Sequence, residues 1–256
     1  TEKIGVYMSE KDMEEKEGLY IPRRLMELDS HPIEGNFDLE HLCKINQYLF
    51  QDLPKLGGKY ERFYKPGQYR AELLPWKTWM KHRPIPGTSK TSNIVYSNMD
   101  KIIINETQDF LKKNIDINKM KKMQVKTFVK KMTEIYSKLD YLHPFRDGNS
   151  RTIREFTREL ALKAGFEMNW EKSNLNQEKR NELYIARDLA VNKIAYDRAL
   201  SMELKYDIEM YMKPFKNCKK LEEILSENIE KIKVKKQKIV MSFSDKDKSN
   251  NRNMGR

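Results

Sequence analysis

The segment 143–154 joins two amphipathic stretches, and its sequence is His143-Pro144-Phe145-Arg146-Asp147-Gly148-Asn149-Ser150-Arg151-Thr152-Ile153-Arg154. Before it, apolar residues recur at helical spacing from about residue 119 to Leu142, and after it a second apolar stripe runs from Ile153 to Gly165. Pro144 disfavours the right-handed helical conformation at the residue before it, so we expect the first helix to end at His143. The segment is therefore predicted to be a short loop between two buried helices.

The polar residues of this loop have the chemistry of a phosphate site that contains a catalyst. His143 is a candidate general base, because an imidazole is largely neutral at pH 7 and can accept a hydroxyl proton. Asp147 is a hard oxygen ligand that suits Mg²⁺. Backbone N–H groups of Gly148, Asn149 and Ser150 can bind an anion at the start of a helix.

Two arginines and a phenylalanine complete the pattern. Arg151 and Arg154 are three residues apart, so both lie on one helix face and can bind phosphate oxygens. Phe145 is expected to anchor the loop in the core. Taken singly, a histidine of this kind is usually structural and an arginine pair is usually a solvated helix face. Their combination in one short loop is what favours a functional site.

At these residues the chain resembles the Fic family, whose signature is H-x-F-x-[DE]-G-N-G-R-x-x-R. Every fixed position matches except one, where Ser150 replaces the second glycine. The resemblance extends to the segments 36–42, 48–52 and 57–60, and it covers about residues 30–204. It implies an all-helical domain with a small β-hairpin, the flap, over the active site.

The resemblance also implies a reaction, in which AMP is transferred from ATP to a Tyr, Thr or Ser hydroxyl of a target protein, with Mg²⁺ as cofactor and with automodification. His143 would be the base, Asp147 the metal ligand, and Gly148, Asn149, Ser150, Arg151 and Arg154 the phosphate-binding residues. Some family members transfer UMP, phosphocholine or a phosphoryl group, and these donors remain alternatives. A catalytically weak, toxin-like interaction module is the non-enzymatic alternative, although the intact His143 and Asp147 argue against it.

Ser150 allows two interpretations. A position that requires a positive φ would make a side chain cost about 1 kcal/mol relative to glycine. A position with ordinary dihedral angles at the helix start would suit serine, which is a favoured N-cap. We favour the second interpretation, and expect the reaction class to survive the substitution.

A second short pattern lies upstream, where Ser30-x-x-x-Glu34-Gly35 resembles the family's inhibitory motif. When that motif precedes the catalytic domain, as in class II members, its glutamate pairs with the second arginine of the signature. The resemblance therefore implies that Glu34 pairs with Arg154 and inhibits the enzyme. Pro32 lies within the pattern, so an inhibitory helix here would have to be short or bent.

Four regions follow along the chain. Residues 1–35 form an N-terminal helical segment that we expect to be interrupted at Tyr20-Ile21-Pro22. Residues 36–204 form the catalytic core, with the flap at about 60–96, where helical periodicity is lost and Asn93-Ile94-Val95-Tyr96 is the best strand. Residues 205–241 are predicted to be helical, with helices near 196–212 and 218–235, and residues 242–256 to be a disordered tail.

The composition favours a soluble protein. The net charge is +12, but the lysines are dispersed, so a solvated surface is a better interpretation than nucleic-acid binding. Cys43 and Cys218 are the only cysteines, which gives no basis for a disulfide framework or a zinc site. The sequence has neither an apolar run long enough to span a membrane nor the apolar core of a signal peptide at Thr1-Glu2-Lys3-Ile4, so we expect a cytoplasmic location. A homo-oligomer is left open.

Overall fold

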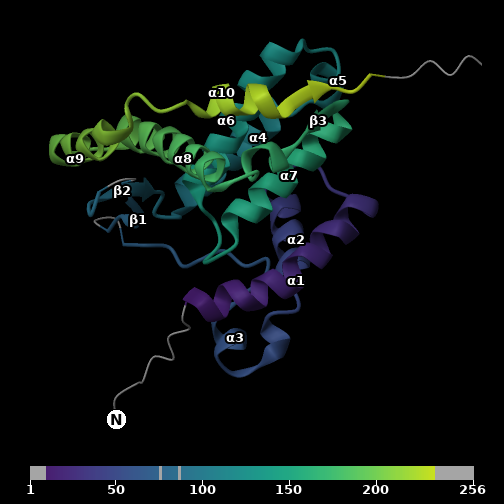
Figure 1. Ribbon diagram of the computed structural model, residues 1–256, viewed down its shortest axis with the longest axis horizontal. Coiled ribbons are helices and arrows are strands. Elements are labelled where there is room, and N and C mark those ends of the chain that lie inside the picture. Colours follow the sequence, from purple (N-terminus) through teal and green to yellow (C-terminus); the bar gives the residue numbers. More distant parts are fainter. Residues whose placement is uncertain (1–9, 75–76, 86–87, 234–256) are drawn as a thin grey trace, which may run out of the picture.

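The computed structural model describes residues 10–74, 77–85 and 88–233, and it consists mainly of helices (Figure 1). The helices are α1 (Glu10–Ser30), α2 (Leu39–Phe50), α3 (Gly58–Phe63), α4 (Lys101–Asn114), α5 (Ile117–Met120), α6 (Val125–Leu142), α7 (Asn149–Lys163), α8 (Gln177–Arg198), α9 (Met202–Met212) and α10 (Leu221–Asn228), with 3-10 turns η1 (Pro54–Leu56), η2 (Trp170–Ser173) and η3 (Lys213–Phe215). The strands β1 (Trp79–Pro84) and β2 (Thr91–Tyr96) form one antiparallel pair, and β3 (Phe166–Met168) and β4 (Ile229–Lys231) form another. The predicted helical fold with a β-hairpin is confirmed.

Helix α6 is the centre of the core, because α4, α7, α8 and α10 all pack against it. Its buried stripe includes Phe128, Met132, Ile135 and Leu139, which follow helical spacing. Phe128 also stacks on Phe166 of β3 with ring centroids 3.8 Å apart. Because four helices pack against α6, the position of its C-terminus is fixed. The loop 143–148 begins at that C-terminus.

Helix α1 is continuous, so the predicted interruption at Tyr20-Ile21-Pro22 is wrong. Proline inside a helix removes one backbone hydrogen bond, but packing compensates here. Ile21 and Leu28 lie on one face, 2% and 0% exposed, and Arg24 donates to Asp52 at the C-terminal end of α2 at 2.7 Å. Burial against α2 therefore outweighs the local preference of proline.

The hairpin is formed by β1 and β2, with Trp79 opposite Tyr96 and Pro84 opposite Thr91. The predicted strand at residues 93–96 lies within β2. The predicted loss of helical structure from Tyr60 is wrong at its start, because α3 extends to Phe63. Gly57 caps that turn of helix and Gly58 begins it, with positive φ angles of 71° and 54°, which glycine adopts readily.

The C-terminal part differs from the prediction in two places. The helix expected near 196–212 is divided between the end of α8 at Arg198 and α9, which Ser201 caps through its side chain. The helix expected near 218–235 is shorter, and the chain continues as β4, which pairs with β3. Residues 234–256, which include the end of the predicted helix and the predicted tail at 242–256, lie outside the described part of the chain. No helix within the described ranges combines the length and the apolar character needed to cross a bilayer.

Candidate active site

His143 lies at the C-terminus of α6, in a left-handed conformation with φ 48° and ψ 58°. Such a conformation is unfavourable for a residue with a side chain, and it persists only where the surroundings hold it. Arg70 does so from the long segment before the hairpin. Its guanidinium donates to His143 O at 2.8 Å, and its backbone N–H donates to Pro144 O at 2.8 Å. Burial lowers the pKa of Arg70 to about 10, so it remains charged at pH 7.

The imidazole of His143 is buried at 3% exposure, and neither ring nitrogen has a hydrogen-bond partner among the described residues. The ring of Tyr96, at the end of β2, lies 4.1 Å away between centroids. Nδ1 lies 3.8 Å from Oδ1 of Asp140, one helical turn earlier on α6. Burial lowers the pKa of His143 to about 4, although Asp140 opposes the shift. The imidazole is therefore neutral at pH 7, as a general base must be.

The loop after His143 is closed by Asn149. Its side-chain oxygen accepts from Phe145 N at 2.9 Å, and its amide nitrogen donates to Phe145 O at 2.7 Å. Phe145 is buried in the core, as predicted. Gly148 has φ 77° and faces Phe50, so that a Cβ there would lie 2.1 Å from the ring. The Asn149 side chain thus shapes the loop, which leaves the backbone N–H groups at the start of α7 for anion binding.

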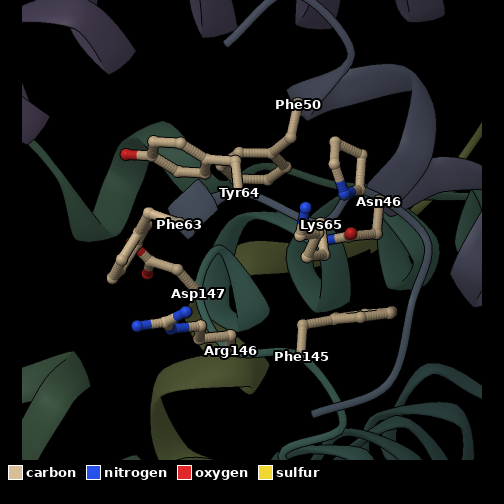
Figure 2. A pocket seen from close by; sticks show the side chains of 9 residues that line it. Asn46, Phe50, Phe63, Tyr64, Lys65, Phe145, Arg146 and Asp147 are labelled. Carbon is tan, nitrogen blue, oxygen red and sulfur yellow. The ribbon is translucent and has the colours of Figure 1, made fainter. Parts of the chain in front are cut away.

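Asp147 has one oxygen engaged locally, because Oδ1 accepts from Gly148 N at 2.7 Å. Its carboxylate makes no ion pair within the described ranges, and it lines an open pocket together with Arg146 and Phe63 (Figure 2). The described residues contain no cluster of three or more metal-ligating side chains. A carboxylate with one oxygen that accepts no hydrogen bond from the described residues, as in Asp147, still suits Mg²⁺, which binds one or two carboxylates together with substrate phosphates.

The two arginines of the loop differ in their partners. Arg151 pairs with Glu17 of α1, with Nη1 and Oε2 2.5 Å apart, and Tyr64 donates to the other oxygen of Glu17 at 2.7 Å. Burial raises the pKa of Glu17, although Arg151 opposes the shift. Arg154 has no carboxylate partner among the described residues, and its Nε donates to Ser150 O at 3.3 Å. Of the two arginines in the first turns of α7, Arg154 is thus the one whose charge is not already balanced by an ion pair.

The predicted contact between Glu34 and Arg154 is not made in the described structure. Glu34 is exposed, in the connection between α1 and α2. Ser30 is the last residue of α1, and its hydroxyl donates only to Met26 O at 3.5 Å. The carboxylate that reaches Arg151 comes from Glu17 of α1, which packs against α2.

The flap residues Asn93, Ile94, Val95 and Tyr96 lie on β2, beside the loop and α8. Asn192 of α8 holds the outer edge of this strand. Its oxygen accepts from Val95 N at 2.9 Å, and its amide nitrogen donates to Asn93 O at 2.9 Å. On the other strand Met80 and Lys81 are exposed. Among the described residues, the edge of the hairpin that has no backbone partner is therefore that of β1.

Three residues of the site carry no recognisable signal in the sequence. Glu17 lies on a helix with many acidic residues, Arg70 in an irregular segment, and Arg187 on a helix with weak periodicity. Arg187 donates to both oxygens of Asp140 at 3.0 Å and to Ser150 Oγ at 2.9 Å. In the sequence, Arg187 and Asp188 interrupt an otherwise apolar stretch at 185–191, and this pattern does not indicate a partner for either side chain.

Comparison with known proteins identifies relatives of this chain. Residues 36–161 match the model of the Fic/DOC family. The protein adenylyltransferase VbhT of Bartonella schoenbuchensis is 27% identical over 160 residues, which cover 62% of this chain and 28% of that protein. The probable protein adenylyltransferase Fic of Escherichia coli is 31% identical over 77 residues, or 29% of this chain and 38% of that protein.

Two solved structures show the same fold. One is the BepC protein of Bartonella tribocorum with bound AMPPNP, with a TM-score of 0.56 and 16% identity over 91% of this chain and 93% of that one. The other is the N-terminal Fic domain of a putative cell filamentation protein of Bartonella quintana with bound ADP, with a TM-score of 0.54 and 16% identity over 91% of each chain.

Proposed function

Because this chain belongs to the Fic/DOC family through residues 36–161, we propose that it is a protein adenylyltransferase, which transfers AMP from ATP to a hydroxyl group of a protein. The observation that carries the proposal is the placement of a buried, neutral His143 next to the N-terminus of α7 and its arginines. Curated relatives named protein adenylyltransferases support it, as do the nucleotides bound in the two structural neighbours. The matched region spans 28% of the length of VbhT.

The reaction needs a base and a site for negative charge. His143 Nε2 accepts the proton of a Tyr, Thr or Ser hydroxyl, and the resulting oxygen attacks the α-phosphorus of ATP. A new P–O bond forms while the bond to the β-phosphate oxygen breaks, and pyrophosphate leaves. The first-turn N–H groups of α7 and the guanidinium of Arg154 stabilise the developing charge. Asp147 would hold Mg²⁺, which neutralises phosphate charge when bound.

The position of a radioactive label in ATP tests this reaction directly. With AMP transfer, label from the α-phosphate becomes attached to protein and label from the γ-phosphate does not. Phosphoryl transfer gives the reverse result, and labelled UTP or CDP-choline tests UMP and phosphocholine transfer. Incorporation into the chain itself would show automodification. If no donor labels protein in a lysate, and the His143→Ala variant behaves like the wild type, the alternative of a non-enzymatic interaction module is favoured.

The flap supports a way to align the target. A strand of the target would add to β1, because Asn192 already occupies the outer edge of β2. That pairing is independent of side chains along the added strand, so it orients a hydroxyl towards His143 without specifying a sequence. His82 lies opposite Asn93, whose carbonyl oxygen points to Asn192, so the backbone N–H of His82 points away from β2. Substituting His82 with proline would remove a donor from the outer edge of β1 and should impair transfer to a target protein while ATP binding is retained.

Self-inhibition is also part of the proposal, with the geometry favouring a different glutamate from the one that the sequence motif indicated. Glu17 occupies Arg151, and a carboxylate and a phosphate compete for the same guanidinium. Glu34, which the motif places on Arg154, is exposed and would have to move to reach it. We therefore assign the inhibitory role to Glu17, with Tyr64 holding its carboxylate. A cytoplasmic location remains a prediction.

A further inference from the structure

Ser150, which replaces the glycine of the family signature, has a partner outside the loop. It is the second residue of α7 and has no positive φ, so its side chain introduces no backbone strain. The cap of α7 is Gly148, so Ser150 is not an N-cap, which corrects our preferred interpretation of this position. Its Oγ accepts from Arg187 Nη1 at 2.9 Å. The hydroxyl hydrogen can still be donated to another acceptor.

Arg187 connects three helices from a buried position on α8, where it is 5% exposed. It donates through Nε and Nη2 to the two oxygens of Asp140 on α6, both at 3.0 Å. The rings of Tyr136 and Tyr184 lie 5.6 and 5.5 Å from the guanidinium. A buried pair of this kind adds little net stability, because desolvation offsets the attraction. Its clear effect is geometric, since it fixes Asp140 and Ser150 relative to each other.

Asp140 extends this network to the base. Its Oδ1, which accepts from Arg187, lies 3.8 Å from His143 Nδ1. Catalytic contacts are often this long before the substrate binds. Burial disfavours the ionised form of Asp140, but Arg187 outweighs this and lowers its pKa to about 2. A carboxylate beside Nδ1 favours the tautomer with the proton on that nitrogen, which leaves Nε2 as the acceptor.

We infer that Arg187 is a positioning residue that couples the base to the phosphate-binding turn. Through Asp140 it selects the Nδ1–H tautomer of His143, and through Ser150 it directs a hydroxyl donor to the nucleotide phosphate. The second half rests on the proposed function, whereas the first is a property of the protein alone. Serine in place of the signature glycine is then the residue that brings Arg187 into contact with the nucleotide site.

The tautomer is tested by ¹⁵N NMR of the imidazole nitrogens in the full chain. The sequence contains four histidines, and His143→Ala identifies the signals of His143. We expect the Nδ1–H form to dominate in the wild type and in Ser150→Ala. Asp140→Asn and Arg187→Lys should each lower the ratio of the two tautomers at least about threefold, a loss of somewhat more than half a kcal/mol. An unchanged ratio in both variants would overturn the inference.

The link to phosphate is tested by a double-mutant cycle. Calorimetry gives the affinity for a non-hydrolysable ATP analogue of Ser150→Ala, Arg187→Lys and the double variant, all in a Glu17→Gln background. Each single change should weaken binding about threefold to tenfold, the value of one hydrogen bond. The double variant should be no weaker than the weaker single variant, because both changes remove the same contact. Additive losses would contradict the coupling.

Two controls keep the outcomes distinct. If the Glu17→Gln protein binds no ATP analogue at all, the proposed function fails while the tautomer measurement remains valid. If Arg187→Lys does not fold, as judged by circular dichroism, the combination of Asp140→Asn with Arg187→Gln replaces the ion pair by two amides. That variant is expected to lose the Nδ1–H preference, and a retained preference would refute the role of the pair.

Discussion

The loop between α6 and α7 and the segment that precedes α2 both contain charged residues in short sequence patterns, but the two regions differ in structure. In the loop, Asn149 closes the backbone around Phe145 through two hydrogen bonds. In the N-terminal segment, Glu34 matches a pattern and is exposed, whereas Glu17 matches none that we identified and is buried against Arg151. A role follows from burial and partners, and these depend on the course of the whole helix.

The largest expected effect tests the loop. His143→Ala should reduce AMP transfer by at least about 10²- to 10⁴-fold, the usual contribution of a positioned base. The affinity for an ATP analogue should change little, because the imidazole contacts the hydroxyl and not the phosphates. Label transfer from α-labelled ATP, measured in single turnover, checks the rate. His31→Ala is the matched control, since His31 is exposed in the N-terminal segment. Equal loss in both variants would contradict the assignment of the base.

The difference between the regions also explains what the sequence could reveal. The helices α2, α6 and α7 follow apolar periodicity, and the loop could be interpreted because its residues act together within a few positions. Glu17 could not be predicted, because its contact requires α1 to continue through Pro22, and the packing of Ile21 and Leu28 decides that. Local preference is a weak guide where tertiary burial competes with it.

Arg70 and Arg187 could not be predicted for a related reason. Each acts on a residue far away in sequence, His143 for Arg70 and Asp140 for Arg187. Periodicity identifies a helix face but not the partner of a polar side chain on it. The role of Asn149 was likewise predicted only in part. The sequence indicated that Asn149 belongs to a phosphate site, but not that the Asn149 side chain closes the loop.

The next largest effect concerns that closure. Asn149→Ala removes two hydrogen bonds to Phe145, so we expect the loop to lose its fixed shape. His143 keeps its position at the end of α6, but the bound phosphate would shift relative to it. A displacement of about 1 Å at a reacting group costs about 10²-fold in rate, and we expect a loss of kcat of that order. Thermal unfolding should show a cost of about 1–3 kcal/mol from the unsatisfied buried groups. Asn36→Ala, at an exposed position of the N-terminal segment, should change neither. Unchanged kcat in Asn149→Ala would refute the role in closure.

A gain of function is expected from Glu17. Glu17→Gln removes the negative charge beside Arg151 but keeps an oxygen that can accept from Tyr64. The affinity for an ATP analogue should rise about tenfold, at the lower end for a charged contact because Arg151 is one-third exposed. Isothermal calorimetry measures it, with Glu15→Gln, an exposed glutamate on the same helix, as the control. An affinity equal to that of the wild type would exclude competition by Glu17.

A smaller effect should appear with pH. Burial raises the pKa of Glu17, so on acidification its carboxylate takes up a proton at a higher pH than an ordinary glutamate does. Protonation weakens the pair with Arg151, so the advantage of Glu17→Gln over the wild type in ATP-analogue affinity should narrow between pH 7.5 and pH 5. His143 stays neutral in that window, because its pKa is about 4. A constant advantage would mean that Glu17 remains fully ionised.

The pKa values of His143 and Glu17 are shifted in the folded state, so the free energy of unfolding also depends on pH. It is therefore measured for the wild type and for Glu17→Gln between pH 7.5 and pH 5. Folding lowers the proton affinity of His143 below its ordinary value of 6.5, so this residue costs stability progressively as the pH falls below about 6.5. Glu17 acts in the opposite direction, because folding raises its proton affinity and acidification relieves the cost of burying its charge. Thermal unfolding of the wild type and of Glu17→Gln at each pH separates these changes in stability from the change in ATP-analogue affinity.

The smallest effect is expected from Glu34. The stretch around it is shaped by His41, whose Nε2 contacts Ile33 O at 2.9 Å, while a Cβ on Gly35 would lie 2.4 Å from the imidazole. The segment that contains Glu34 therefore joins α1 to α2 through its contacts with His41. The exposed carboxylate of Glu34 does not contribute to these contacts.

Glu34→Gln should accordingly change ATP-analogue affinity and transfer rate by less than about twofold, the scale of an exposed charge. Gly35→Ala is the contrasting variant and should lower the melting temperature, because the added methyl group collides with His41. Both variants are compared with Glu17→Gln over the same ATP titration. If Glu34→Gln raised the rate as much as Glu17→Gln does, the connection between α1 and α2 would have to leave its position on His41 and bring Glu34 to Arg154.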